Sequence, residues 1–146
     1  MSEEEKIKGI QIIKDLEKIM PNYDIFIMFG TLLGAVREGK IIDNDSDVDV
    51  CYLSHYHTAE EVEKEMIDIY KILINNGVLI KYFTQKRKSM WWEGITDLKK
   101  EIKNPFGQAH ILINDICIDL FTSWIDENGD FFTCQWGNFG KADLFF

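Results

Sequence analysis

Two aspartates, Asp47 and Asp49, have the spacing in this chain that most clearly predicts chemistry. They alternate with Val48 and Val50. In an extended strand, residues two apart point to the same face, with Cα atoms about 6.5–7 Å apart. Two carboxylates on one face of a valine-rich strand are costly to bury unless a cation compensates their charge. The spacing therefore predicts that the pair shares one Mg²⁺ ion, with Mn²⁺ as the alternative, or holds two ions about 4 Å apart.

A third acid, Asp119, fits the same pattern. It is the lone charged residue in the run 116–121, where Ile116, Ile118 and Leu120 form one apolar face. Taken alone, this pattern fits a solvent-facing strand residue equally well. Beside the aspartate pair, we favour a third metal ligand that also acts as a general base and takes a proton from an attacking hydroxyl.

A glycine–threonine step, Gly30-Thr31, is predicted to bind phosphate. It follows an apolar run and precedes a helix-like segment. Glycine permits close backbone approach, and the first N–H groups of a helix attract anions. Thr31 is expected to cap that helix and to donate its hydroxyl to a phosphate, although a plain turn with a capping threonine has the same sequence. Arg37 is a further candidate for phosphate binding, with an exposed ion pair as an equally good account.

Other kinds of metal site fit the sequence less well. Residues 43–47 are similar to the start of an EF-hand loop, but Val48 stands where that loop requires glycine, and Ser54 where it requires glutamate. His55 and His57 lack a third ligand at zinc spacing, so we expect them in a loop. His110 has no obvious partner in the sequence.

Size and composition restrict the class of protein. The chain has 146 residues, of which 46% are hydrophobic and 28% charged, as in a single globular domain. Its 16 basic and 25 acidic residues give a net charge of −9, which argues against general nucleic-acid binding. No apolar run approaches the roughly 20 residues of a transmembrane segment, and the acidic start at 2–5 is unlike a signal peptide. We therefore expect a cytoplasmic protein, with Cys51 and Cys117 as free buried thiols.

Periodicity and capping residues predict a mixed α/β or α+β domain around one sheet flanked by helices. Ser2 with Glu5, and Thr58 with Glu61, have the spacing of helix N-caps. Asn114-Asp115 separates two β-rich runs and predicts a hairpin. The expected helices cover 2–20, 31–37 and 58–75, with a further short helix from 96 onward. The expected strands cover 24–29, 47–53, 78–84, 109–114, 116–123 and 131–136.

The segment GTLLGAVREGKIIDNDSDVDV, residues 30–50, closely resembles the signature of the LicD/fukutin-type transferases, a branch of the nucleotidyltransferase fold. That signature comprises a GTLLG-like phosphate turn, a following arginine and a D-x-D strand. The IDLF run around Asp119 is similar to the family's third-carboxylate strand. The resemblance is tight over 26–53 and looser over 116–146. It implies one nucleotidyltransferase-fold domain over 1–146. Family members usually run longer, and the last residues, Asp143-Leu144-Phe145-Phe146, are too apolar for a free tail. We therefore expect either that the chain is truncated at its C-terminus or that this end packs on something.

The resemblance also implies an activity. Family members transfer a phospho-alcohol, such as phosphocholine, from a CDP-linked donor to a hydroxyl of a glycan or lipid-linked glycan and release CMP. Carried over by position, Gly30 and Thr31 would hold the donor's phosphates, Asp47 and Asp49 would chelate Mg²⁺, and Asp119 would complete the site.

Two alternatives remain open from the sequence. One is nucleotidyl transfer from a nucleoside triphosphate to a small molecule or a protein, and the other is a non-catalytic remnant of the fold. For a choline-bearing donor, Trp91 and Trp92 are candidates to hold the quaternary ammonium by cation–π attraction, although an aromatic core is the more ordinary role for such residues.

Overall fold

The computed structural model describes residues 2–41, 48–85, 88–91, 105–135 and 138–141. Within these ranges, it describes the backbone alone at 29–30, 59, 81–85, 88–91, 105–107, 134–135 and 138–141. The described elements are three helices, α1 (Glu3–Ile19), α2 (Phe29–Glu38) and α3 (Ala59–Asn75), and eight strands. The strands are β1 (Ile25–Ile27), β2 (Val48–Leu53), β3 (Leu79–Gln85), β4 (Lys88–Trp91), β5 (Pro105–Ile113), β6 (Ile116–Ile125), β7 (Phe131–Gln135) and β8 (Asn138–Lys141).

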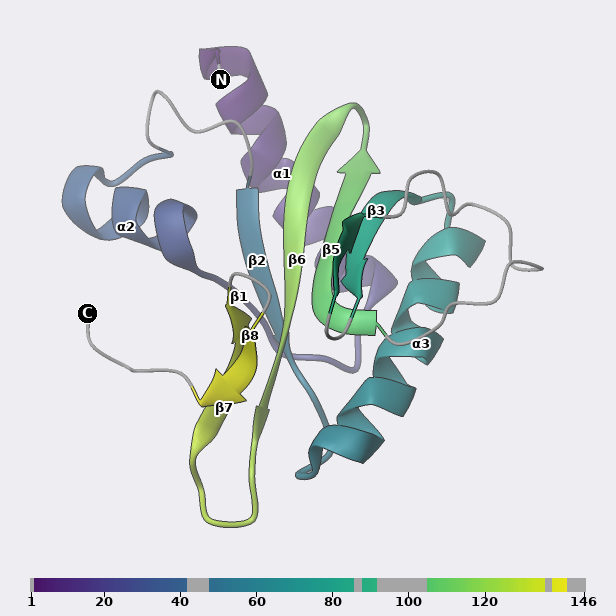
Figure 1. Ribbon diagram of the computed structural model, residues 1–146. Coiled ribbons are helices and arrows are strands. Elements are labelled where there is room, and N and C mark those ends of the chain that lie inside the picture. The colour runs from purple at the N-terminus through teal and green to yellow at the C-terminus, as the bar shows by residue number, and fades with distance from the viewer. Residues whose placement is uncertain (1, 42–47, 86–87, 92–104, 136–137, 142–146) are drawn as a thin grey trace.

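The strands form one mixed sheet in the order β1-β2-β6-β5-β3-β4. Strand β7 pairs with the C-terminal end of β6, and β8 pairs with β7. Among the described strands, β2 and β6 form the one parallel pair. Helices α1 and α3 both pack on the core face of the sheet. In Figure 1, α1 lies behind the strands and α3 to their right, whereas α2 lies to the side of β2. The expected central mixed sheet with flanking helices is therefore confirmed.

The hydrophobic core fills the space between the sheet and helices α1 and α3. Alternate residues of β2 and β6 point into it, and Val48, Val50, Ile118 and Leu120 are at most 1% exposed. The helices contribute residues at three- and four-residue spacings. They include Ile12, Leu16, Val62, Met66, Ile69 and Leu73. Because strand side chains alternate, residues 49 and 119 lie on the opposite face of the sheet.

Local signals set most element ends. Ser2 and Glu5 form a complete capping box at α1, and the Thr58 side chain accepts a hydrogen bond from the Glu61 N–H at α3. Helix α2 ends at Gly39, whose φ of 67° is left-handed. The predicted helices at 2–20 and 58–75 are confirmed. Among the described residues, no helix combines the length and apolar composition that crossing a bilayer requires.

The start of α2 differs from its predicted position. The apolar run 26–29 was expected to end a strand, with the helix starting at Thr31, but the strand ends at Ile27 and the helix begins at Phe29. Met28 serves both elements, because its N–H donates to the carbonyl of Asp49 (3.0 Å) and its carbonyl accepts from the N–H of Leu32 (3.2 Å). Strands β4 and β8 were not predicted, and the helix expected from residue 96 lies outside the described residues.

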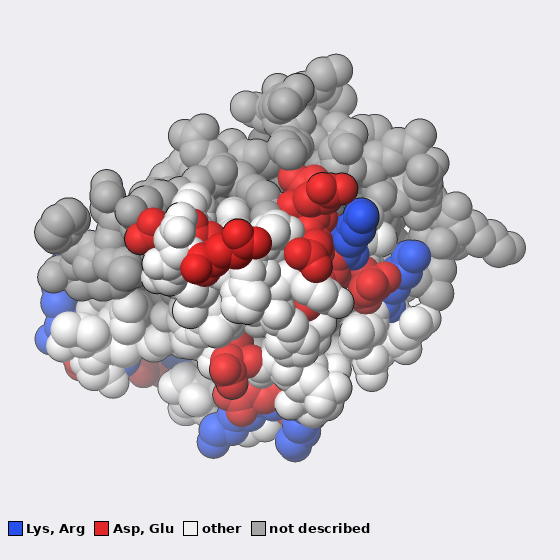
Figure 2. Space-filling view, turned by 90° about the horizontal axis from the view of Figure 1, so that it is seen from below, with Lys and Arg blue, Asp and Glu red and all other residues white. Residues whose placement is uncertain are grey.

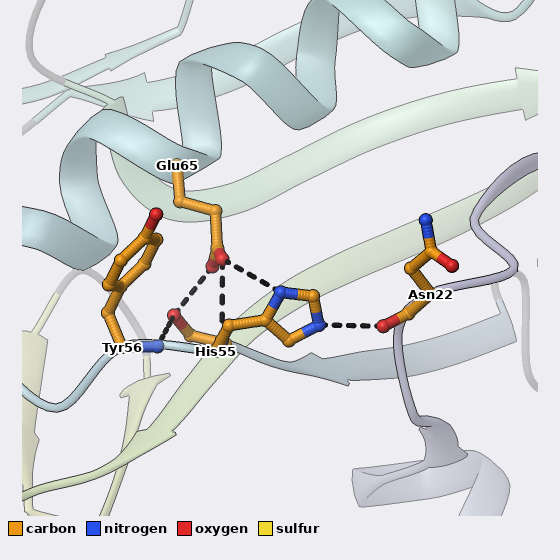
Figure 3. Close-up of polar contacts among 5 residues, drawn as sticks. Asn22, His55, Tyr56 and Glu65 are labelled. Carbon is orange, nitrogen blue, oxygen red and sulfur yellow. Dashed lines mark hydrogen bonds and ion pairs between the residues drawn. The ribbon is translucent and has the colours of Figure 1, made fainter.

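A buried carboxylate, Glu65 on α3, holds the loop that follows β2 (Figure 3). It is 5% exposed. It accepts hydrogen bonds from the Ser54 hydroxyl (2.5 Å) and the His55 N–H (3.3 Å), and Ser54 Oγ in turn accepts from the Tyr56 N–H (3.1 Å). Since buried polar groups are costly without partners, Glu65 fixes this loop at the end of β2 that lies away from Asp49.

His55 extends this network to the loop before β1. Its Nδ1 lies 3.7 Å from a Glu65 oxygen, and its Nε2 donates to the carbonyl of Asn22 at 2.6 Å. The ring stacks on Tyr23, with centroids 4.3 Å apart and planes 1° apart. Burial, with the nearby Glu65 carboxylate, raises the pKa of Tyr23 to about 12, so its phenol stays protonated at neutral pH. His55 and His57 lie in a loop, as predicted.

Replacing Glu65 with alanine should lower the free energy of unfolding by about 2–4 kcal/mol, because the Ser54 hydroxyl and the His55 N–H would lose a buried charged acceptor. Urea denaturation measures the change. Glu60→Ala is the matched control on the same helix, and its exposed side chain should leave stability within about 0.5 kcal/mol. Equal stabilities of the two variants would contradict the role given to Glu65.

Candidate functional site

The pairing of β2 with β6 places Asp49 beside Asp119. The two residues are register partners, on neighbouring parallel strands whose backbones lie about 4.8 Å apart. Both are half-buried. They share the face of the sheet opposite α1 and α3, since their neighbours Val48, Val50 and Ile118 are fully buried in the core. The structure therefore brings together two of the three acids predicted from the sequence, while Asp47 lies outside the described residues, immediately before β2.

His110 extends the pair to a row of three polar side chains across β2, β6 and β5, and the expectation that it has no obvious partner is wrong. It lies on β5 directly opposite Asp119. Its Nδ1 is 2.7 Å from Asp119 Oδ1, with the two side chains 7% and 16% exposed. A signal for this contact was present: a two-residue turn at Asn114-Asp115 makes residues 110 and 119 the fourth pair outward from the turn.

Thr31 connects the start of α2 to Asp49. The Asp49 N–H donates to Thr31 Oγ1 at 2.7 Å, and Thr31 is 4% exposed. The expected helix-capping role of Thr31 is wrong, because Met28 is the N-cap and no side chain caps the helix there. Thr31 is instead the third helical residue, so the positive end of the α2 dipole, which includes Gly30, lies beside Asp49.

The positions of Arg37 and Trp91 give no support to the ligand-binding roles predicted for them. Arg37 lies in the last turn of α2, about 9 Å along the axis from Thr31. Its exposed side chain is 4.0 Å from Glu38, which agrees with the alternative of a surface ion pair. Trp91 ends β4, with β5 and β3 between its strand and that of Asp119. Its side chain, like the whole of Trp92, lies outside what the structure describes.

A small apolar cluster borders the carboxylates on the same face. Cys51 and Phe121 are the next same-face residues after Asp49 and Asp119, and they pack with Met28 and Phe26. Burial raises the pKa of the Cys51 thiol to about 12. Cys51 is a free buried thiol, as predicted, whereas the prediction of burial is wrong for Cys117, which is only half-buried. The part of this face next to the carboxylates is therefore shielded from water, and electrostatic interactions are stronger beside such a region.

The donor set of this site fits a hard divalent cation. Two carboxylates at paired positions of adjacent strands repel each other, and a cation between them would offset that repulsion. Mg²⁺ and Mn²⁺ prefer such oxygen ligands. Within the described ranges, no three histidine, cysteine, aspartate or glutamate residues form a metal cluster. The third carboxylate that the sequence supplies, Asp47, lies outside those ranges, so the three-carboxylate site stays a prediction.

The far end of β2 has a different character. A cavity of about 330 Å³ beside the Glu65 network is lined by Tyr23, His55, Tyr56, Glu61, Lys64, Glu65 and Asp68. Figure 2 views the molecule from this end and shows groups of acidic side chains on its surface. Carboxylates repel phosphate, so we place the candidate site for a phosphorylated ligand at Asp49 and Asp119, beside the helix start.

Thr31→Val should cost about 1–3 kcal/mol of unfolding free energy, because it removes the acceptor of the Asp49 N–H. Thr31→Ser keeps the hydroxyl and loses one methyl group, so it should cost about 0.8 kcal/mol or less. Urea denaturation of both variants in metal-free buffer measures the difference. Two variants of equal stability would show that this hydrogen bond does not hold α2 to β2.

The rate at which Cys51 is alkylated tests whether water reaches the apolar cluster next to the carboxylates. The thiolate is the reactive form, so a pKa near 12 should keep Cys51 unmodified by iodoacetamide from pH 7 to 10 in the folded protein. Peptide mass spectrometry after unfolding in urea should then show Cys51 modified readily. Rapid modification in the folded state, rising from pH 8 as for an ordinary thiol, would show that water reaches this cluster.

Comparison with known families places the chain. The family model described as LicD/FKTN/FKRP, nucleotidyltransferase domain, matches residues 22–145. The matched region contains the whole row of Asp49, Asp119 and His110, together with Thr31. A search of curated proteins found no match.

Proposed function

The chain belongs to the LicD/FKTN/FKRP nucleotidyltransferase-domain family, and from this premise we propose that it is a Mg²⁺-dependent phospho-alcohol transferase. Membership makes it a transferase domain and implies a nucleotide-activated donor. The proposal adds that the donor is a CDP-linked alcohol, such as CDP-choline, that the acceptor is a glycan hydroxyl, and that CMP is released.

The observation that carries this proposal is the register pair of Asp49 and Asp119 beside the start of α2. Mg²⁺ held by Asp47, Asp49 and Asp119 would neutralise charge on the donor's two phosphates. The N-terminal turn of α2 binds a phosphate through its peptide N–H groups. Phosphoryl transfer needs mainly such positioning and electrostatic stabilisation, which the two strands and the helix provide.

In the proposed reaction, Asp119 accepts the proton of the acceptor hydroxyl. The hydroxyl oxygen forms a bond to the phosphorus that carries the alcohol. The bond from that phosphorus to the bridging oxygen breaks, and the electron pair leaves with CMP. Asp49 lies on the strand next to Asp119, so its carboxylate stays close to the reacting phosphates throughout.

CMP release tests the proposal. The chain is incubated with CDP-choline, CDP-ribitol or CDP-glycerol, a glycan acceptor and Mg²⁺, and CMP is measured by chromatography. We expect CMP from at least one donor, and complete loss with EDTA. Asp49→Asn and Asp119→Asn should each lower the rate at least about 100-fold, as expected when transition-state charge stabilisation is removed, whereas the exposed Glu127→Gln should keep the rate.

The products separate the competing activities. Pyrophosphate formed from a nucleoside triphosphate, without CMP from any CDP-alcohol, would favour nucleotidyl transfer. Neither product, together with no Mg²⁺-dependent thermal shift by any CDP-alcohol or nucleoside triphosphate, would favour a remnant that has lost catalysis.

A further inference from the structure

The row formed by Asp49, Asp119 and His110 indicates a role for His110 that the family resemblance did not include. We propose that His110 is a positioning residue, which holds Asp119 by one carboxylate oxygen so that the other oxygen faces the metal ion shared with Asp49. This inference rests on the proposed function, because the ion is part of that proposal.

The contact is short and sheltered. Nδ1 of His110 lies 2.7 Å from Oδ1 of Asp119, and the histidine side chain is 7% exposed. An ionised carboxylate only accepts hydrogen bonds, so Nδ1 carries a proton and donates it. Hydrogen bonds to a charged acceptor are about twice as strong as neutral ones. Water has little access with which to compete for Asp119 Oδ1.

The backbone makes this contact reproducible. His110 and Asp119 are direct cross-strand partners, with Cβ atoms about 4.5–5.5 Å apart. Their neighbours Ala109, Ile111 and Ile118 are fully buried on the core face, so neither strand can rotate the pair away from the site without exposing the core. The sheet therefore holds the imidazole beside the Asp119 carboxylate, where Nδ1 meets Oδ1.

Hydrogen bonds join both acids of the site to neighbouring elements. Asp49 is held through its backbone, by the Thr31 hydroxyl and the Met28 N–H. Asp119 is held through its side chain by His110. Partners of metal-binding carboxylates usually change metal affinity or activity by 10- to 100-fold when they are removed. The same size of effect is expected here for a residue that need not touch the ion itself.

The test uses Mn²⁺ alone on the full chain, with free Mn²⁺ measured by electron paramagnetic resonance. His110→Phe keeps the ring volume without a donor and should raise the Kd for Mn²⁺ about 10- to 100-fold. His110→Asn places an amide N–H close to the position of Nδ1 and should restore the Kd to within about threefold. His57→Phe, in the loop at the other end of β2, is the control and should keep the wild-type Kd.

The outcomes separate this inference from the proposed function. If wild-type protein binds Mn²⁺ and releases CMP, but His110→Phe binds Mn²⁺ with the wild-type Kd, the positioning role is overturned and the function stands. If His110→Phe only lowers the melting temperature of the metal-free protein, leaving the Kd unchanged, its role is structural and the inference is also overturned. If wild-type protein does not bind Mn²⁺, both fail.

Discussion

Electrostatic repulsion between two carboxylates is the constraint around which this sheet is organised. Asp49 and Asp119 lie at the same level of adjacent parallel strands, where their charges oppose folding unless something offsets them. The opposite face of the same two strands supplies the offset, because Val48, Val50 and Ile118 are completely buried there. Apolar burial on one face thus holds like charges together on the other, which is the arrangement on which the proposed metal site rests.

The two ends of β2 have different roles: the first carries the candidate site, and the second is held by the Glu65 network. At its start, Asp49 is joined to the first turn of α2 by Thr31, so a helix dipole and a carboxylate are presented together. At its end, the buried Glu65 ties down the loop to α3, and His55 joins that loop to the segment before β1. Hydrogen-bond networks therefore fix both ends of β2, the strand that carries Asp49.

Local chemistry in the sequence predicted local structure well. The caps at Ser2 and Thr58 and the turn at Asn114-Asp115 act within a few residues, and each was confirmed. The alternation around Asp119 predicted its face correctly. The pairing of β2 with β6 could not be predicted, because no local signal specifies which distant strand becomes a neighbour.

Other features escaped prediction for identifiable reasons. The apolar run 26–29 looks uniform, so nothing marks Met28 as the point where strand becomes helix. Strands β4 and β8 are four residues each and have weak β propensity. Glu65 resembles an ordinary surface glutamate, and its burial depends on a loop that packs over it. His110 is different, because the predicted hairpin already contained its partner.

The tight turn at Asn114-Asp115 has a consequence for how this family member can diverge. Both residues have positive φ, 49° and 65°, which asparagine and aspartate tolerate better than most residues. An insertion or deletion that moved β6 by one position against β5 would turn Asp119 inward and Ile118 outward. A change in the length of this connection therefore endangers the position of Asp119, whereas an exchange among asparagine, aspartate and glycine keeps the backbone that the turn requires.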